Sequence, residues 1–542
     1  MGNKRKSRRT RQSAPIRMQL KNHSLSQIDE PYIRTLSHED LITLSTKLLN
    51  DLKEAREQLN QGPNNSSRPP SSQAPWENGK EVEEEDEPTL AESVSGEEES
   101  GSGDVEAQEP TGQSPAGEES SNTQVSAAKR KAGKTKGSPG SGRTQCIALT
   151  HTVDHRVERC EICEREAPEC AEQRPWTAYF TLDIEVGEGE ALGLRVTHTK
   201  HMFYETSCQC GHTSRQCPHR GEADGVWEGI GLSEWRLVGP MLCALIIALT
   251  YRARLSRTRV QEFLREWLGV ELSVGTLQRC IEESARSAAP VEAQLVADVL
   301  TSELLHADET PHKEHGRPRW LWVFVSATTV LFYVGYRTKE ILDTLLGETY
   351  GGWLMSDGYA VYRAIAKRLR CWAHLRRKAK GLEESLNPEG RQFGQQTTAF
   401  LKTLMTAIYQ AREGPGADLT PLFQDQLDQF RAACERARGS SHEKTHALAV
   451  EFLKDWEAIF RVLAHPHLPL TNNEAERALR HWVILRRISY GTRSPQGSRA
   501  FAMLASLIDT CRKRNASPWR YLAEVIDRAR RGEQVPMLPT AS

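Results

Sequence analysis

In Leu304-Leu305-His306-Ala307-Asp308-Glu309-Thr310 a short apolar run leads directly into an acid, which predicts a strand that ends near Asp308. A second run, Trp353–Ser356, leads into Asp357, and Glu476 follows in a polar segment with helical spacing. Ligands collect at the carboxyl ends of strands in α/β sheets, so we expect Asp308 and Asp357 to share one sheet edge. Either aspartate alone would more often be a helix cap or a turn residue, so the prediction depends on all three acids.

Three carboxylates of this kind can hold two divalent cations roughly 4 Å apart, which serve displacement reactions at phosphorus. Mg²⁺, or Mn²⁺ in its place, suits carboxylate and phosphate oxygens. We therefore interpret Asp308, Asp357 and Glu476 as catalytic residues and as the ligands of two such ions. Glu474 and Glu476 point about 200° apart on a helix, so only one of them can face the ions. Glu309 would lie on the opposite side of the strand from Asp308, and we predict a structural or outer-shell role for it.

The segments around these acids predict a mixed α/β layer. Strand and helix patterns follow in the order three strands, helix, strand, helix and strand, at Leu304–Ala307, Trp320–Ala327, Val330–Tyr336, Lys339–Leu346, Trp353–Ser356, Tyr359–Lys367 and Leu369–Ala373. Residues 376–465 are helical in pattern, and Glu474–Trp482 and Phe501–Lys513 are predicted as further helices. This layout of acids, with a helical insertion before the last one, is similar to that of RNase H-like nucleotidyl transferases.

A pair of helices is predicted upstream of this layer. Ser256 can cap a helix that runs to Trp267, and Ser273 can cap a second helix through Arg286. The intervening Leu268-Gly269-Val270 predicts a tight turn, so the segment fits a helix-turn-helix, although helical bundles contain the same spacing.

Seven of the twelve cysteines lie in residues 146–217, which indicates a metal site in a reducing compartment rather than a disulfide framework. Cys160 and Cys163, with Cys208 and Cys210, could form a four-thiolate Zn²⁺ site, which would be structural because no coordination position stays open. The single residue between Cys208 and Cys210 keeps Cys217 or Cys170 open as substitutes. Free thiols are the alternative to zinc.

The distribution of charge along the chain indicates which kinds of partner the protein could bind. Lys+Arg 71 against Asp+Glu 72 gives a net charge of -1, but basic blocks at 1–21 and 129–143 flank an acidic block at 77–119. Such blocks are typical of disordered interaction tails or solvated linkers, and the basic ones could contact nucleic acid. The longest apolar stretch, Leu237–Thr250, is shorter than the ~20 residues of a membrane span. The basic N-terminus has no apolar core, so we expect no signal peptide and a cytoplasmic protein.

These patterns predict that the chain of 542 residues is a multidomain α+β protein. The predicted parts are a basic N-terminal tail at 1–34, a leucine-rich helix at 35–62, a disordered linker at 63–145, a Cys-rich zinc-binding segment at 146–225, a helix-turn-helix domain at 226–298, a catalytic domain at 299–515 with a helical insertion at 376–470, and a C-terminal segment at 516–542.

Several motifs together resemble the insertion sequence 66 (IS66) family of DDE transposases. The resembling segments are His306-Ala307-Asp308-Glu309-Thr310-Pro311, Asp357-Gly358-Tyr359, Cys371-Trp372-Ala373-His374-Leu375-Arg376-Arg377, Asn472-Asn473-Glu474-Ala475-Glu476-Arg477-Ala478-Leu479-Arg480, Asn65-Ser66-Ser67-Arg68-Pro69-Pro70-Ser71-Ser72 and Ser517-Pro518-Trp519-Arg520-Tyr521-Leu522. The chain departs from the family at His481, where proline is usual, and in the spacing of Cys208 and Cys210. The resemblance selects Glu476 over Glu474 as the third acid.

The resemblance implies metal-dependent strand cleavage and strand transfer of an insertion sequence in a bacterial, nucleoid-associated setting. The implied partners are DNA, as element ends and target, a second copy of the chain on that DNA, and companion proteins encoded by the element; no membrane is implied. Two basic groups are predicted to contact the DNA backbone, namely Arg477, Arg480, Arg486 and Arg487, and His374, Arg376 and Arg377. A solvated basic face is the alternative for the first group, and a core histidine is the alternative for His374.

Two other functions fit the same acids. A nuclease of this fold would hydrolyse strands without joining them, and an inactive descendant would only bind DNA as a regulator. Retention of all three acids argues against the second, because a decayed enzyme should lose its metal ligands first.

Overall fold

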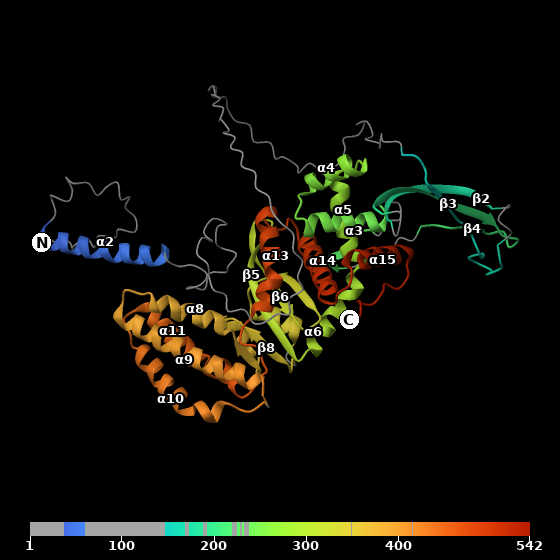
Figure 1. Cartoon of the computed structure of the whole chain (residues 1–542). Coiled ribbons are helices and arrows are strands. Elements are labelled where there is room, and N and C mark those ends of the chain that lie inside the picture. The colour runs from blue at the N-terminus through green and yellow to red at the C-terminus, as the bar shows by residue number, and fades with distance from the viewer. Residues whose placement is uncertain are drawn as a thin grey trace, which may run out of the picture. The chain divides into compact units, whose positions relative to one another are not determined.

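The computed structural model describes residues 37–59, 147–167, 173–187, 192–218, 225–227, 230–231, 238–347, 350–414 and 416–541. The predicted basic tail at 1–34 and the linker at 63–145 lie outside these residues. Helix α2 spans His38–Leu59, where the leucine-rich helix was predicted (Figure 1). The described elements form an α+β protein, and none of its described helices has both the length and the apolar character needed to cross a membrane.

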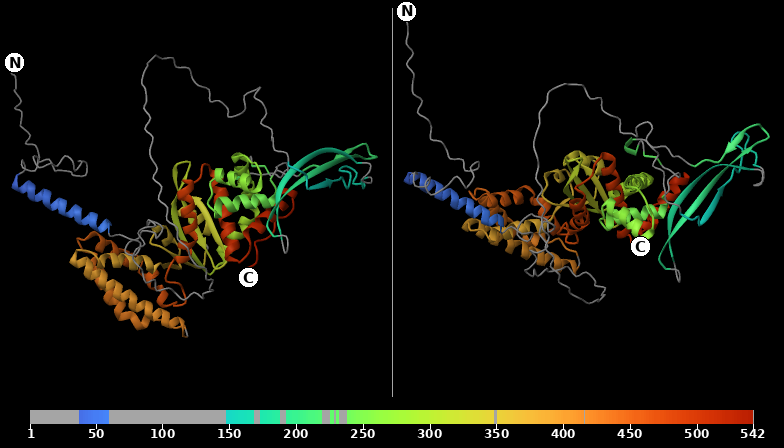
Figure 2. Two further views of the ribbon diagram at one scale, coloured as in Figure 1. Left: turned by 45° about the horizontal axis from the view of Figure 1, so that its top comes forward. Right: turned by 90° about the horizontal axis from the view of Figure 1, so that it is seen from above.

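The first sheet was not predicted and comes from the cysteine-rich part of the chain. Its strands are β1 (His151–His155), β2 (Arg174–Val186), β3 (Leu194–Ser207) and β4 (Thr213–Arg215). The long strands β2 and β3 are antiparallel and lie side by side along their length, as Figure 2 shows. Strand β1 is parallel to β3, and β4 is antiparallel to β3. Few side chains of β2 and β3 are fully buried, so these strands lack the apolar runs that marked strands elsewhere.

A group of helices connects the two sheets. They are α3 (Pro240–Ile247) with its π-helical extension η6 (Ala248–Arg252), α4 (Arg257–Leu268), α5 (Val274–Ser287), the 3₁₀ turn η7 (Ala289–Val291) and α6 (Glu292–Thr301). The predicted caps are confirmed: Ser256 Oγ accepts a hydrogen bond from Arg259 N–H at 3.3 Å, and Ser273 Oγ accepts one from Thr276 N–H at 3.0 Å. Gly269 ends α4 in the left-handed region with φ +62°, where a glycine carries no steric penalty.

The second sheet has five strands in the order β7-β6-β5-β8-β9. They are β5 (Leu304–Glu314), β6 (Arg317–Val325), β7 (Val330–Gly335), β8 (Trp353–Ser356) and β9 (Arg368–Arg370). Strands β5, β6 and β7 form an antiparallel meander, whereas β8 and β9 run parallel to β5. Helix α7 (Lys339–Leu346) links β7 to the parallel part. The mixed layer predicted from the sequence is therefore present.

Three boundaries differ from the prediction. Strand β5 continues to Glu314, so Asp308 lies within the strand rather than at its end, because antiparallel pairing with β6 extends beyond the short parallel pairing with β8. The helix expected at 359–367 is only a 3₁₀ turn, η8 (Ala360–Ala364). The last strand ends at Arg370 and a helix already begins at Trp372, two residues on, where a strand to Ala373 was expected.

The segment predicted as helical forms a set of helices with a core of its own. They are α8 (Trp372–Glu383), α9 (Pro388–Arg412), α10 (Thr420–Ala437), α11 (Glu443–Lys454), α12 (Trp456–Phe460) and the 3₁₀ turn η9 (Arg461–Leu463). Phe430 stands at the centre of the aromatic packing, against Phe400 with ring centroids 4.3 Å apart and against Phe452 at 5.1 Å.

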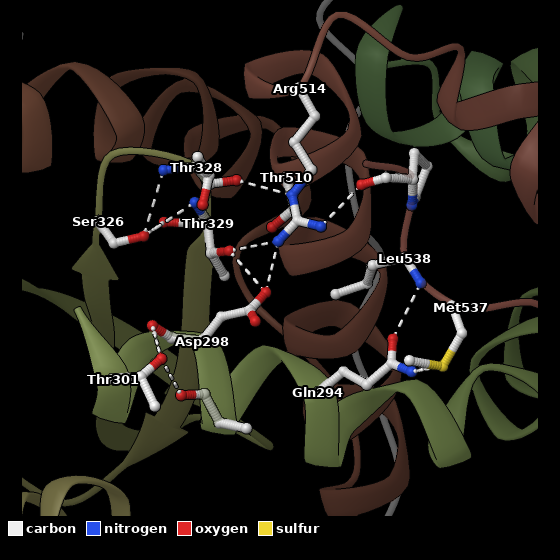
Figure 3. Close-up of polar contacts among 12 residues, drawn as sticks. Gln294, Asp298, Thr301, Ser326, Thr328, Thr329, Thr510, Arg514, Met537 and Leu538 are labelled. Carbon is white, nitrogen blue, oxygen red and sulfur yellow. Dashed lines mark hydrogen bonds and ion pairs between the residues drawn. The ribbon is translucent and has the colours of Figure 1, made fainter. Parts of the chain in front are cut away.

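Three helices complete the described chain: α13 (Asn473–Ser489), α14 (Pro495–Lys513) and α15 (Pro518–Arg531). Helix α13 packs on β5 and β6, and α14 packs on β7 (Figure 1). Arg514, just after α14, donates to the carbonyl oxygens of Thr328 at 3.0 Å and Pro539 at 2.7 Å, and it pairs with Asp298 of α6 (Figure 3). One arginine thus joins α6, the β6–β7 turn and the C-terminal residues.

Candidate functional site

The first two predicted acids lie on neighbouring strands in matching register. The last parallel pair between β5 and β8 is His306 with Met355, and Asp308 and Asp357 each lie two residues beyond it. Asp357 directly follows β8, and its Oδ1 accepts a hydrogen bond from Tyr359 N–H at 2.8 Å. The fold therefore brings these two acids to the same edge of the parallel part of the sheet.

The third acid, Glu476, lies in the first turn of α13, and Asn472 sets the position of that turn. Asn472 is fully buried, and its Nδ2 donates to the carbonyl oxygen of Ala307 at 2.8 Å, immediately before Asp308. Its backbone N–H donates to Cys371 Sγ at 3.2 Å, after β9. Asn472 thus ties the start of α13 to both parts of the sheet edge. No periodic signal marked Asn472 in the sequence, although it lies inside the motif that contains Glu476.

The carboxylates interact strongly with one another. Burial raises the pKa of Asp308 well above its ordinary value, and the charges of Asp357, Glu309 and Glu476 raise it further. Burial also raises the pKa of Glu476, where the Arg377 guanidinium opposes the shift and Asp357 adds to it. The buried Oε1 atom of Glu476 has no hydrogen-bond partner. Buried, mutually repelling carboxylate oxygens are a donor set that fits divalent cations.

The two glutamates near these acids are held elsewhere. Glu309 accepts hydrogen bonds from Arg337 Nη2 at 2.6 Å and from the Tyr362 hydroxyl at 2.5 Å, and burial raises its pKa to about 7. Glu474 forms ion pairs with Lys513 of α14 at 3.0 Å and with Arg477 at 3.2 Å. Glu474 also lines a cavity of about 560 Å³ at the start of β5, together with Lys513 and His306. Glu474 is therefore engaged on a different side of α13 from Glu476.

The residues predicted to contact DNA include some that are partly buried by other side chains and some that are exposed. His374 and Arg377 lie against Glu476, with Nε2 and Nη2 at 3.8 Å and 3.6 Å from its Oε1, and burial together with nearby cations lowers the pKa of His374 to about 3. Arg486 donates to Thr310 Oγ1 at 3.0 Å. The exposed members are Arg376, Arg477, Arg480 and Arg487. The His374 imidazole is mostly buried and lies beside the third acid, so both predictions for it, DNA contact and core histidine, stay open.

The four predicted cysteines are brought together at one end of the first sheet. The Sγ atoms of Cys160 and Cys210 are 3.6 Å apart, those of Cys163 and Cys208 are 3.4 Å apart, and all four lie within 4.8 Å of one another. Gly211, with φ +86°, turns the chain directly after Cys210, so the short spacing still places both sulfurs in the group. Cys217 is exposed and outside the group, and Cys170 lies outside the described residues.

The thiols of this group differ in acidity. The N–H groups of Cys163 and Ile162 lower the pKa of the Cys160 thiol to about 6, which favours its thiolate, whereas the neighbouring thiol of Cys208 and burial raise that of Cys163 to about 11. Four sulfur donors at these separations are the tetrahedral set that structural Zn²⁺ takes.

Residues 236–500 match the family described as "Transposase IS66 family". Over these residues the chain is similar to IS66 family transposases. The match spans the second sheet, all three acids and the helical insertion.

Curated relatives of the chain occur in Sinorhizobium fredii (strain NBRC 101917 / NGR234). It is 26% identical over 281 residues to "Uncharacterized protein y4qI", covering 44% of this chain and 51% of that protein. It is 26% identical over 302 residues to "Uncharacterized protein y4hP", covering 48% of this chain and 54% of that protein. The chain spans about half the length of these two relatives.

Proposed function

We propose that this protein is a DNA transposase that cleaves strands at the ends of an insertion sequence and joins them to target DNA. The observation that supports this most is the meeting of Asp308, Asp357 and Glu476 at one sheet edge. The sheet order, an antiparallel meander followed by two parallel strands, supports an RNase H-like catalytic domain at 299–515. The inserted helices α8 to α12 agree with the family layout.

Asp308, Asp357 and Glu476 would hold two Mg²⁺ or Mn²⁺ ions. Such ions, when bound, activate the attacking oxygen and stabilise the leaving 3′ oxygen. The chain's own part is to keep three carboxylates close despite their repulsion. Asn472 positions Glu476 relative to β5, and Arg377 offsets part of the negative charge of Glu476. Hydrogen bonds from Arg337 and Tyr362 hold the Glu309 carboxylate in its own buried position, separate from the three ligands.

Two surfaces would bind DNA. Helix α5 is exposed at its N-terminal end, including Arg279, while its C-terminal half is buried, which is the arrangement of a recognition helix in a helix-turn-helix. Arg477, Arg480 and Arg487 recur on one exposed face of α13, next to the acids, and suit phosphate contacts. We assign specific binding of the element ends to 226–298 together with the zinc-binding segment at 146–225, and backbone contacts to α13.

The zinc proposal concerns folding of the first sheet. A Zn²⁺ ion held by Cys160, Cys163, Cys208 and Cys210 would join the turn after β1 to the turn between β3 and β4. A chelator should then remove about one zinc ion per chain from this sheet, and Cys160→Ser should lose the same ion. A first sheet that stays folded and metal-free would contradict the assignment.

The decisive experiment uses a labelled duplex that carries one element end and a plasmid as target, with Mg²⁺. The wild-type chain should nick the end and transfer the exposed 3′-OH to the plasmid. Asp308→Asn, Asp357→Asn and Glu476→Gln should each lower both activities at least roughly a thousandfold while end binding persists, and their losses should not add. Glu474→Gln is the matched control and should stay active.

Other results would favour the rival functions. Nicked products without joined products would indicate a nuclease. Specific binding of the end without any metal-dependent cleavage would indicate a regulator. Activity in Glu476→Gln with loss in Glu474→Gln would contradict the choice of the third ligand.

A further inference from the structure

A second group of metal-ligand side chains lies beside the third acid. Cys371 precedes α8, His374 follows one turn later, and Glu476 comes from α13. The Cys371 sulfur, a His374 ring nitrogen and a Glu476 carboxylate oxygen all lie within 4.8 Å of one another. Across the described ranges, this trio and the four cysteines of the first sheet are the groups of three or more such ligands. The trio does not include Asp308 or Asp357.

The polar atoms of this trio are poorly satisfied within the protein. His374 Nδ1 and Glu476 Oε1 are buried and have no hydrogen-bond partner. The 3.8 Å between His374 Nε2 and Glu476 Oε1 is too long for a hydrogen bond. A buried polar atom without a partner is unfavourable for folding, so two of them in one place indicate a ligand.

The sulfur of Cys371 is fixed in place beside the other two donors. Its Sγ accepts the backbone N–H of Asn472 at 3.2 Å, from the residue that precedes α13. Burial and the charge of Glu476 raise the pKa of this thiol to about 11, and the backbone N–H groups of Asn472, His374 and Ala373 oppose that shift. A hydrogen bond to a ligand atom orients that atom toward the ion. Cys371 is fully buried, so its thiol has little access to large reagents.

The three donor atoms, a sulfur, a ring nitrogen and a carboxylate oxygen, favour zinc over magnesium. A thiolate, an imidazole and a carboxylate are the ligands that Zn²⁺ takes, whereas Mg²⁺ prefers oxygen alone. Three protein ligands leave one tetrahedral position for water. On binding, the ion replaces the thiol proton of Cys371, which is released to solvent.

We propose that Cys371, His374 and Glu476 form a second zinc site that inhibits the enzyme by occupying the third catalytic carboxylate. Zinc binding itself follows from the trio alone, and its inhibitory effect rests on the proposed role of Glu476 as a Mg²⁺ ligand. Zn²⁺ at this site and Mg²⁺ at the catalytic site would compete for the same Glu476 oxygens. Micromolar zinc would then stop strand cleavage at millimolar magnesium.

The first test counts zinc on the full-length protein. The chain is equilibrated with Zn²⁺ in excess Mg²⁺ and dialysed, and zinc is measured by atomic emission. Cys371→Ser and Glu476→Gln should each carry one zinc ion fewer than the wild type. Cys434→Ser, which changes another fully buried cysteine in α10, is the matched control and should carry the wild-type number. Equal counts in the wild type and Cys371→Ser would overturn the site.

A second measurement needs no variant and stays informative if Cys371→Ser misfolds. The wild-type chain is loaded with Zn²⁺ at the four-cysteine site and then titrated with Co²⁺. Co²⁺ should bind with a thiolate charge-transfer band and the visible bands of a tetrahedral ion, and one equivalent of added Zn²⁺ should remove them. Absence of a thiolate band in this titration would rule out Cys371 as a ligand.

The inhibitory part is tested with the nicking assay at fixed Mg²⁺. The zinc concentration for half-inhibition should rise in Cys371→Ser by more than the roughly 10–100-fold that loss of an outer-shell partner can cost. Equal inhibition of both proteins would overturn the inhibitory role. A chain without any nicking activity would refute the proposed function, and the zinc count and Co²⁺ spectrum would still decide the binding site.

Discussion

Two regions of the chain surround buried carboxylates with opposite charges, so their pKa values shift in opposite directions. Asp455, between α11 and α12, is almost completely buried and is surrounded by Arg363 at 2.9 Å, Arg368 at 2.6 Å and Arg370 at 3.1 Å. Burial alone would raise the pKa of Asp455, but hydrogen bonds from Arg368 and Arg363 bring it below its ordinary value. Asp308 has the reverse situation, because burial and three neighbouring acids raise its pKa.

This difference separates a carboxylate that the chain neutralises from the carboxylates that we propose as metal ligands. The Asp455 cluster joins β9 to the helical insertion and is neutralised by the chain itself. At the sheet edge, Asp308 has three acids as its charged neighbours, and Arg377 opposes only part of this repulsion through Glu476. A protein keeps such a cluster where function requires it, and perturbed carboxylates are therefore a guide to reactive sites.

The largest expected effect on stability comes from Asp455. Asp455→Asn leaves three arginines around a neutral side chain, so it should lower the free energy of unfolding by about 3–5 kcal/mol. Asp308→Asn relieves repulsion and should change this free energy by less than about 1 kcal/mol, or raise it. Urea denaturation of both variants without divalent metal measures the contrast. Equal destabilisation by the two substitutions would contradict it.

The Asp455 cluster also predicts a pH dependence. Because the pKa of Asp455 is lower in the folded than in the unfolded chain, its stabilisation is fully present above the unfolded value and is lost as pH falls through the folded value. The stability difference between the wild type and Asp455→Asn should therefore be constant near neutral pH and should shrink below about pH 4. A difference that stays constant down to pH 3 would argue against the charge of Asp455 as its cause.

A smaller effect is expected from adding metal. Mg²⁺ that binds only the folded site should stabilise the chain by about 2.7 kcal/mol at a hundred times its dissociation constant. Thermal unfolding with and without Mg²⁺ measures this shift. Asp308→Asn should abolish it, and Glu474→Gln should retain it. A shift of the same size in Asp308→Asn would show that the ion binds elsewhere.

The position of Glu476 should depend on Asn472. Asn472→Ala removes the bond to the Ala307 carbonyl and leaves that oxygen buried, which should cost about 1–3 kcal/mol and reduce strand cleavage. The matched control is Asn473→Ala at the adjacent exposed residue, which should change stability by less than about 0.5 kcal/mol. Wild-type cleavage by Asn472→Ala would show that α13 is positioned by other contacts.

The smallest expected effect concerns single phosphate contacts. Arg477→Ala, Arg480→Ala or Arg487→Ala should each weaken DNA binding similarly for all sequences and reduce the salt-dependence slope by about 1. Arg438→Ala, an exposed arginine at the end of α10, serves as the control and should leave the slope unchanged. Binding measured by fluorescence anisotropy over a series of salt concentrations distinguishes these outcomes. Unchanged slopes in all three variants would favour the solvated basic face.

Local chemistry made several features predictable from the sequence. Ser256 and Ser273 cap their helices as expected, because a cap depends on the residue itself and the next few N–H groups. The helices of residues 372–463 and most strands of the second sheet followed from hydrophobic periodicity. Asp308 and Asp357 stood out by the apolar runs before them, whereas Glu476 was selected by the family resemblance. The predictions of a helix at 359–367 and of a strand that ends at Ala307 were wrong, because neighbouring strands decide where such elements end.

Tertiary structure alone decided how the acids and cysteines meet. The chain contains both Glu474 and Glu476, and only the packing of α13 shows that Lys513 engages the first while Arg377 lies beside the second. The role of Asn472 depends on Ala307 and Cys371, which are distant in sequence and leave no periodic signal. Likewise, the single residue between Cys208 and Cys210 did not favour a shared site in the sequence. In the structure, the turn after β3 places their sulfurs beside those of Cys163 and Cys160. Sequence pattern reports each residue's local preference, whereas a site is a set of long-range distances that only the packed chain defines.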